Sequence, residues 1–198
     1  MSPHLCHLAM LVLWGAWCSY WLGSAFGGKR TARRESRASR LSHILPVGCG
    51  VWLILAPLTR PAWLGAAVLA PSAARCLLAL ALVALGLLFS VWARLHLGRN
   101  WSASVTAKRD HELVRSGPYA WVRHPIYTGL LLALLGNALD VAAPRALVGW
   151  LIVLLGFTRK LRIEEGFMAG LFGAAYARYR DEVPALLPLR AARRSAPR

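Results

Sequence analysis

The stretch CLLALALVALGLLFSVWARLHL, residues 76–97, decides the fold class, because its only charged side chain, Arg94, lies near its end. A membrane-spanning helix needs about 20 predominantly apolar residues, and this stretch meets that requirement. The whole chain is 198 residues long and 57% apolar, with a mean hydropathy of +0.47. Only 16% of its residues are charged, whereas roughly 25% is typical of soluble domains. This composition excludes a disordered chain and argues against an ordinary soluble domain.

Four further apolar stretches predict four more spans: residues 5–26, 42–58, 126–143 and 146–157. The last one is short, and we expect its helix to continue through residues 159–165. The first one follows a segment without Lys or Arg and is longer than the apolar core of a signal peptide, so we expect an uncleaved span. We therefore predict an all-α fold, an integral membrane helical bundle of about five transmembrane helices.

The basic residues fix the expected orientation of this bundle. The chain has 24 Lys and Arg against 8 Asp and Glu, a net charge of +16. Residues 29–40 hold six basic residues, residues 94–123 hold six, and residues 159–198 hold nine. Long apolar stretches separate these clusters, so we expect no nucleic-acid binding. Cytoplasmic loops retain Lys and Arg, which predicts an N-terminus outside and all three clusters, with the C-terminus, on the cytoplasmic side.

Two glycine pairs suggest how the last two spans pack. Gly129 and Gly136 lie seven residues apart in one span, and Gly149 and Gly156 repeat that spacing in the next. Small residues on one helical face let two helices approach closely. With the short connection around Pro144, this pattern predicts a tight hairpin of the fourth and fifth spans.

We predict no metal site. The cysteines lie in or beside apolar stretches without zinc-ligand spacing, and we expect them to be small apolar side chains: Cys6, Cys18, Cys49 and Cys76. His111 and Glu112 begin a pattern typical of zinc proteases, but Arg115 stands where the second histidine is required.

Polar and ionisable residues concentrate in two segments, residues 98–125 and residues 157–167. Ionisable groups beside spans are candidates for function. The first segment, GRNWSASVTAKRDHELVRSGPYAWVRHP, ends where the fourth span begins, and a helix N-terminus attracts anions such as a carboxylate. His124 at this point is either a capping residue or a functional one, and the sequence leaves both readings open.

The second segment, FTRKLRIEEGF, carries two adjacent acids, Glu164 and Glu165. Lys160 lies four residues before Glu164 and therefore shares its helical face. The simple interpretation is a solvated helix with an ion pair. The functional one is a carboxylate pair that holds a sulfonium or an ammonium cation.

Together, HELVRSGPYAWVRHPIYTG at residues 111–129, the acidic pair, and FGAAYARYRDEVPALLP at residues 172–188 resemble the isoprenylcysteine carboxyl methyltransferase family. More broadly, they are similar to the membrane methyltransferases that include phospholipid N-methyltransferases. The resemblance implies an enzyme that uses S-adenosyl-L-methionine in a cytoplasmic-side pocket formed by the C-terminal half. We accordingly expect transmembrane helices on the lipid or substrate side over residues 1–91, a methyltransferase-like half over residues 92–189, and a disordered basic tail over residues 190–198.

Carried onto this sequence, the resemblance implies a set of cofactor-binding residues, of which the last would hold the cofactor's amino group: His111, Glu112, Leu113, Val114, Gly117, Tyr119, His124, Pro125, Ile126, Tyr127 and Glu164. The implied catalytic residues are Lys160, Arg162 and Glu165. Lys160 stands where eukaryotic members have an arginine that addresses the substrate carboxylate. Lysine keeps the charge but loses the bidentate fork of arginine.

The expected reaction is methyl transfer to a lipid-like or prenylated acceptor in the bilayer, preferably to its carboxylate. The cofactor is itself a strong electrophile, so the protein must mainly align the reactants and exclude water. An amine acceptor would instead need a base such as His124 or Glu165. The sequence also leaves open a membrane reductase that uses NADPH and a basic, non-enzymatic scaffold that binds anionic lipid.

Overall fold

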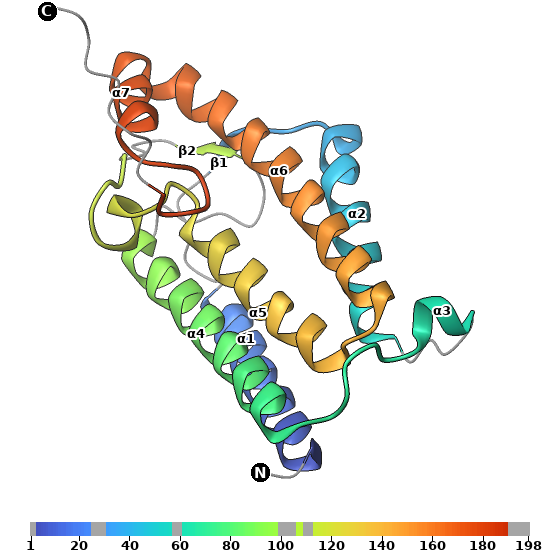
Figure 1. Cartoon of the computed structure of the whole chain (residues 1–198). Coiled ribbons are helices and arrows are strands. Elements are labelled where there is room, and N and C mark those ends of the chain that lie inside the picture. Colours follow the sequence, from blue (N-terminus) through green and yellow to red (C-terminus); the bar gives the residue numbers. More distant parts are fainter. Residues whose placement is uncertain (1–2, 25–30, 57–60, 99–105, 109–112, 190–198) are drawn as a thin grey trace, which may run out of the picture.

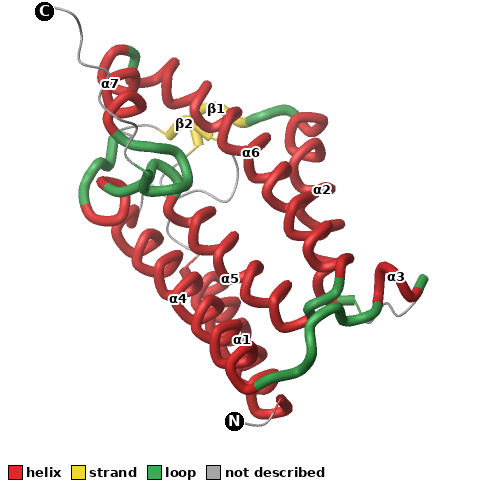
Figure 2. The backbone as a smooth tube through the Cα atoms, in the orientation of Figure 1, coloured by secondary structure: helices red, strands yellow, loops and turns green. Residues whose placement is uncertain are grey.

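The computed structural model describes residues 3–24, 31–56, 61–98, 106–108 and 113–189. Its five long helices are α1 (Pro3–Ser24), α2 (Arg37–Leu55), α4 (Ala73–Leu97), α5 (Pro125–Val141) and α6 (Pro144–Phe172). The shorter elements are α3 (Ala62–Gly65), the 3₁₀ turn η2 (Gly117–Ala120), α7 (Ala174–Glu182) and the strands β1 (Thr31–Arg34) and β2 (Thr106–Lys108). The all-α membrane bundle is confirmed (Figures 1 and 2). The antiparallel ribbon of β1 and β2 was not predicted.

The predicted spans correspond to the five long helices. Three of them, α1, α2 and α4, are long and apolar enough to cross a membrane. Helix α5 is apolar but shorter, and α6 carries the charged segment in its second half. As expected, α6 continues without a break past residue 157 and ends only at Phe172. The expected division between residues 91 and 92 falls inside α4, and residues 190–198 lie outside the described residues.

The glycines of α5 face α4. A Cβ on Gly129 would collide with the carbonyl oxygen of Gly86, and a Cβ on Gly86 would collide with that of Gly129. About two turns further along α5, a Cβ on Gly136 would lie 2.6 Å from the carbonyl oxygen of Ala79. The two backbones therefore touch along this seam, and at these three glycine positions a side chain larger than hydrogen does not fit.

The glycines of α6 face α2 in the same way. A Cβ on Gly149 would collide with the carbonyl oxygen of Gly50, and a Cβ on Gly156 would collide with Val47. The predicted glycine-mediated hairpin of α5 and α6 is therefore wrong. The small residues of α5 and α6 find complementary partners on α4 and α2, so the bundle consists of an α1–α4–α5 group and an α2–α6 group (Figure 1).

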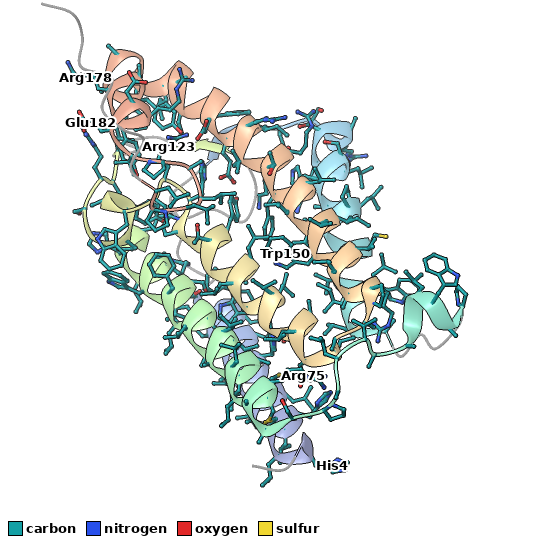
Figure 3. All side chains as sticks on the ribbon, viewed as in Figure 1. His4, Arg75, Arg123, Trp150, Arg178 and Glu182 are labelled. Atoms are coloured by element: carbon teal, nitrogen blue, oxygen red, sulfur yellow. A yellow bond between two sulfur atoms is a disulfide. The ribbon has the colours of Figure 1, made fainter. Side chains whose placement is uncertain are left out.

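Large side chains fill the space between these two groups. Trp14 of α1 packs against the apolar clusters of both groups. Trp150 of α6 lies between α5 and α6 (Figure 3) and donates its indole N–H to the Leu131 carbonyl at 2.8 Å. Large side chains and this hydrogen bond therefore form the contact between α5 and α6.

A disulfide joins Cys6 near the start of α1 to Cys76 near the start of α4, with 6.2 Å between their Cα atoms. The expectation of four unpaired, small apolar cysteines is wrong for this pair, and it fits Cys18 and Cys49 only in that both remain free. Their spacing of 70 residues carries no pairing signal. The two cysteines meet only because α1 and α4 run side by side in the same direction.

Candidate functional site

The start of α5 is held by a backbone strap from the C-terminal segment. The Arg123 N–H donates to the Pro184 carbonyl at 2.8 Å, and the His124 N–H donates to the Ala185 carbonyl at 3.0 Å. The Thr128 hydroxyl donates to the Leu186 carbonyl at 2.7 Å. Pro125 occupies the first helical position, where its missing N–H is not needed. These bonds fix the backbone around His124, whose ring turns toward α6.

There the His124 ring meets both acids of α6. Its Nε2 lies 3.2 Å from Glu165 Oε1, and its Nδ1 lies 3.6 Å from Glu164 Oε2. The Tyr127 hydroxyl, one turn further along α5, donates to Glu164 Oε1. Four residues that the sequence suggested for one site, drawn from two segments about forty residues apart, therefore form one cluster, which we call the His124–Glu164 cluster.

Arg123 completes the cluster and was missed by the sequence analysis. Its Nε and Nη2 donate to Glu165 Oε1 at 2.9 and 2.6 Å. Its Nη1 donates to the carbonyls of Arg180 and Val183 at the end of α7. The side chain is 9% exposed, and Figure 3 places it at the end of the bundle that carries α7. The sequence feature that could have identified Arg123 is its position in the RHP motif, between a buried turn and the start of a helix.

Glu164 and Glu165 differ in the partners that stabilise their charged forms. Burial opposes ionisation of Glu165, but hydrogen bonds from His124 and Arg123 outweigh it and lower its pKa to about 2. Burial also opposes ionisation of Glu164, and the His124 hydrogen bond and the charge of Lys160 outweigh it and lower its pKa. For His124, burial is outweighed by the two carboxylates, which raise its pKa. Both acids are thus ionised at neutral pH, and Glu165 is the one held by an arginine.

Aromatic rings form one wall of the cluster. The Tyr127 ring stacks on His124 with centroids 5.7 Å apart and on Phe157 with centroids 4.9 Å apart. The Lys160 ammonium lies 5.2 Å from the Tyr127 ring centroid, an arrangement that favours a cation over the ring face. Lys160 and Glu164 therefore approach the same tyrosine with opposite charges.

The turn before α5 is packed into the framework. Gly117 has φ of +57°, and a Cβ there would lie 2.8 Å from the His96 ring. Tyr119 is buried, and its carbonyl accepts from the Tyr179 hydroxyl at 2.7 Å. Glycine is thus required at position 117 both by conformation and by space. This turn therefore contacts both the end of α4 and α7.

The other residues of the expected set are placed as follows. Leu113, Val114 and Ile126 are half-buried, and Pro125 is buried. Arg162 is exposed, and no ion pair links it to the cluster within the part of the chain that the structure describes. His111 and Glu112 lie outside the described residues, so their assignment stays a prediction. The expected absence of a metal site also stays a prediction.

The fold and the cluster together define a class: an integral membrane protein with a polar, carboxylate-containing site at one end of a helical bundle. The sequence model of the isoprenylcysteine carboxyl methyltransferase family matches residues 77–170, from α4 into the second half of α6, so this part of the chain is similar to that family.

Individual proteins are similar to the same part of the chain. The chain is 34% identical over 114 residues to a protein-S-isoprenylcysteine O-methyltransferase of Schizosaccharomyces pombe, which covers 56% of this chain and 48% of that one. It is 35% identical over 94 residues to the protein of that name from Saccharomyces cerevisiae, which covers 46% and 39%. The chain thus spans less than half the length of these curated relatives.

A solved structure of a eukaryotic intramembrane Ras methyltransferase, isoprenylcysteine carboxyl methyltransferase, has a similar fold. The TM-score is 0.54 at 24% identity, over 80% of this chain and 55% of that one. At this level of identity the likeness concerns the fold, and it supports the arrangement of membrane helices described above.

Proposed function

We propose that this protein transfers a methyl group from S-adenosyl-L-methionine to the carboxylate of a prenylated or lipid-like acceptor in the membrane. The observation that carries the proposal is the His124–Glu164 cluster, in which an ionised acid, an aromatic wall and Lys160 share one end of the bundle. The names of the relatives supply the reaction type.

The cluster fits the charges of the proposed cofactor. Glu164 has a lowered pKa and lies between the Tyr127 hydroxyl and the His124 ring, and as an ionised carboxylate it is able to hold an ammonium group. The N-terminal N–H groups of α5, next to His124, suit a carboxylate. The bound cofactor would supply the electrophilic methyl group. The protein would supply binding, orientation and exclusion of water.

Lys160 is the residue we assign to the acceptor carboxylate. It is half-buried and lies over the Tyr127 ring on the same side of α6 as Glu164. An ammonium group attracts a carboxylate as a point charge, without the paired geometry of a guanidinium. A carboxylate also needs no proton removed before it attacks.

Glu165 has a different part in this proposal. The bonds from Arg123 and His124 occupy it and keep its pKa near 2, which is too low for a general base near neutral pH. We therefore assign Glu165 to holding the loop against α6. This assignment favours a carboxylate acceptor over an amine, which would require a base.

The proposed orientation places the cluster at the cytoplasmic face. The basic loops support it through the positive-inside rule. The Cys6–Cys76 disulfide supports it independently, because it lies at the opposite ends of α1 and α4, and disulfides persist in oxidising compartments outside the cytoplasm.

The deciding experiment incubates the purified full chain with methyl-labelled S-adenosyl-L-methionine and a farnesylated cysteine that has a free carboxylate. We expect label in a base-labile ester, with the corresponding methyl ester as an unreactive control. Label in an amine or thiol product would contradict the proposed acceptor. No methyl transfer, together with a rise in Tm caused by NADPH alone, would favour a reductase instead.

A further inference from the structure

An aromatic patch lies beside the turn that leads into the His124–Glu164 cluster. Trp121, in that turn, is 57% exposed and contacts two aromatic residues of α4. The centroid of its ring lies 5.6 Å from that of Trp92, edge to face, and 6.3 Å from that of Phe89, nearly parallel. Phe89 and Trp92 also contact each other, with centroids 5.9 Å apart. The proposed reaction uses none of these three residues, which we call the Trp121 patch, so their position calls for another explanation.

The patch continues the surface that α4 turns toward lipid. Helix α4 is long and apolar enough to cross a membrane. Its buried residues Gly86, Ser90 and Ala93 face the other helices. At 3.6 residues per turn, its large exposed side chains lie on the opposite side: Leu85, Leu88, Trp92 and Leu95. Trp121 therefore adds a ring from outside the helix to the end of a row that already faces the bilayer.

Along α4, the patch lies at the end of the membrane-spanning segment. Residues 76–93 contain no charged side chain, and Arg94 is the first one after this run. Trp92 stands two residues before Arg94, so the patch lies where hydrocarbon gives way to polar headgroups. Tryptophan is enriched at this level of a bilayer, because its ring is apolar while its indole N–H seeks a polar partner. The headgroup layer therefore accounts for the exposed tryptophans better than water does.

The patch is closely connected to the cluster through the backbone. The N–H groups of Trp121 and Val122 both donate to the Pro118 carbonyl at 3.2 Å, and Val122 is only 1% exposed. Arg123 and His124 follow directly in the chain. A contact that holds Trp121 therefore also holds the turn before α5 and the residues with which the cluster begins.

We propose that the Trp121 patch binds the phospholipid headgroup layer of the leaflet on the cluster's side and thereby holds the turn before α5 at that depth. The partner is the lipid surface itself, recognised by flat amphipathic rings rather than by charge. This anchor acts through position only and is independent of the reaction that the cluster performs.

The depth of Trp121 is measured by fluorine NMR on the full chain, labelled with fluorotryptophan and reconstituted in phosphatidylcholine nanodiscs. Trp121→Phe and Trp150→Phe identify the two signals by their disappearance. We expect a spin label on the lipid headgroup to remove the Trp121 signal, whereas a label at the end of the acyl chain or a paramagnetic chelate in water leaves most of it. Trp150 is the internal control, because its indole donates to the Leu131 carbonyl inside the bundle, and the headgroup label should leave its signal. Loss of the Trp121 signal only to the aqueous chelate, only to the chain-end label, or to none of the three would overturn the inference.

Hydrogen exchange in the same nanodiscs tests the hold on the turn, at the hydrogen-bonded backbone N–H groups of residues 121–124. Trp121→Leu keeps an apolar contact with α4 but lacks an amphipathic ring, and we expect several-fold faster exchange. Trp121→Tyr should keep the wild-type rate, because tyrosine also favours the interface. Trp63→Leu is the matched control, since Trp63 is 75% exposed on α3 at the other end of the bundle (Figure 1). Equal rates in Trp121→Leu and Trp121→Tyr would indicate packing on α4 only and overturn the inference.

Discussion

Arg123 contacts one oxygen of Glu165 with two of its nitrogens, at 2.9 and 2.6 Å, across 42 residues of sequence. This pair ties the start of α5 to the middle of α6. The pair also gives the two adjacent acids different roles. Arg123 engages Glu165, whereas Glu164, one residue earlier, remains able to receive a cationic ligand.

Removing the charge of Glu164 should abolish most cofactor binding. We expect Glu164→Gln to raise the Kd for S-adenosyl-L-methionine at least tenfold, since a charged hydrogen bond contributes about 1.5 to 3 kcal/mol. Calorimetry measures the change. Asp181→Asn, an exposed acid in α7, is the control and should bind like wild type. Unaltered affinity in Glu164→Gln would remove this residue from the site.

Lys160 should affect the acceptor rather than the cofactor. Lys160→Gln is expected to raise the acceptor KM about tenfold by loss of a counter-charge, with the Kd of the cofactor changed little. Lys160→Arg should preserve activity, because the guanidinium keeps the charge and adds a fork. Initial rates at varied acceptor concentration measure both. A Lys160→Gln enzyme with wild-type KM would contradict the assignment.

Arg123→Ala should destabilise the fold. Removing one partner of a buried ion pair costs about 3 to 5 kcal/mol, which corresponds to a fall in Tm of about 10 °C for a chain of this size. Thermal unfolding in detergent measures it. The double variant Arg123→Ala/Glu165→Ala should be more stable than Arg123→Ala alone, since it leaves no unpaired charge. Greater loss in the double variant would argue against a direct pair.

Stability should fall on both sides of neutral pH. Glu165 has a pKa lowered from 4.5 to about 2, so its contribution is complete above 4.5 and is lost as the pH falls toward 2. His124 has a pKa raised above 6.5, so its contribution is complete below 6.5 and is lost as the pH rises through the raised value. Tm measured against pH should fall on the acidic side and on the alkaline side, and His124→Gln should remove the fall on the alkaline side, the alkaline limb. An unchanged alkaline limb in that variant would assign it to another group.

The seam between α4 and α5 should not tolerate a methyl group. Gly86→Ala would push a Cβ into the carbonyl of Gly129, and overpacking of this kind costs about 1 to 3 kcal/mol. Gly15→Ala on α1 is the matched control, because nothing lies within 4 Å of its added Cβ. A lower Tm for Gly86→Ala and an unchanged or higher Tm for Gly15→Ala are expected. Equal values would show that the seam is loose.

Much of the fold follows from local properties of the sequence. Hydropathy predicted the five long helices, and the family resemblance placed His124, Tyr127, Glu164 and Glu165 in one expected site. Which helices touch was not predictable in this way. The glycines of α5 and α6 were recognised, but their partners Gly50 and Gly86 do not repeat that seven-residue spacing and so carry no periodic signal.

The contacts that were missed are all non-local. The Cys6–Cys76 disulfide depends on α1 and α4 lying in register, which composition does not encode. Arg162, in contrast, was expected in the site, but the structure does not bring it there. Its basic character fitted the expected chemistry, but its position on α6 turns it to the exposed side.

The strap formed by residues 184–186 has a consequence for biosynthesis. Its hydrogen bonds hold the backbone around His124, although every helix that crosses the membrane precedes it in the chain. During translation the bundle can insert before residues 184–186 exist, and the His124–Glu164 cluster acquires its final geometry only after they are made. A nascent chain stopped before residue 184 would therefore be membrane-inserted but incompetent for its ligand.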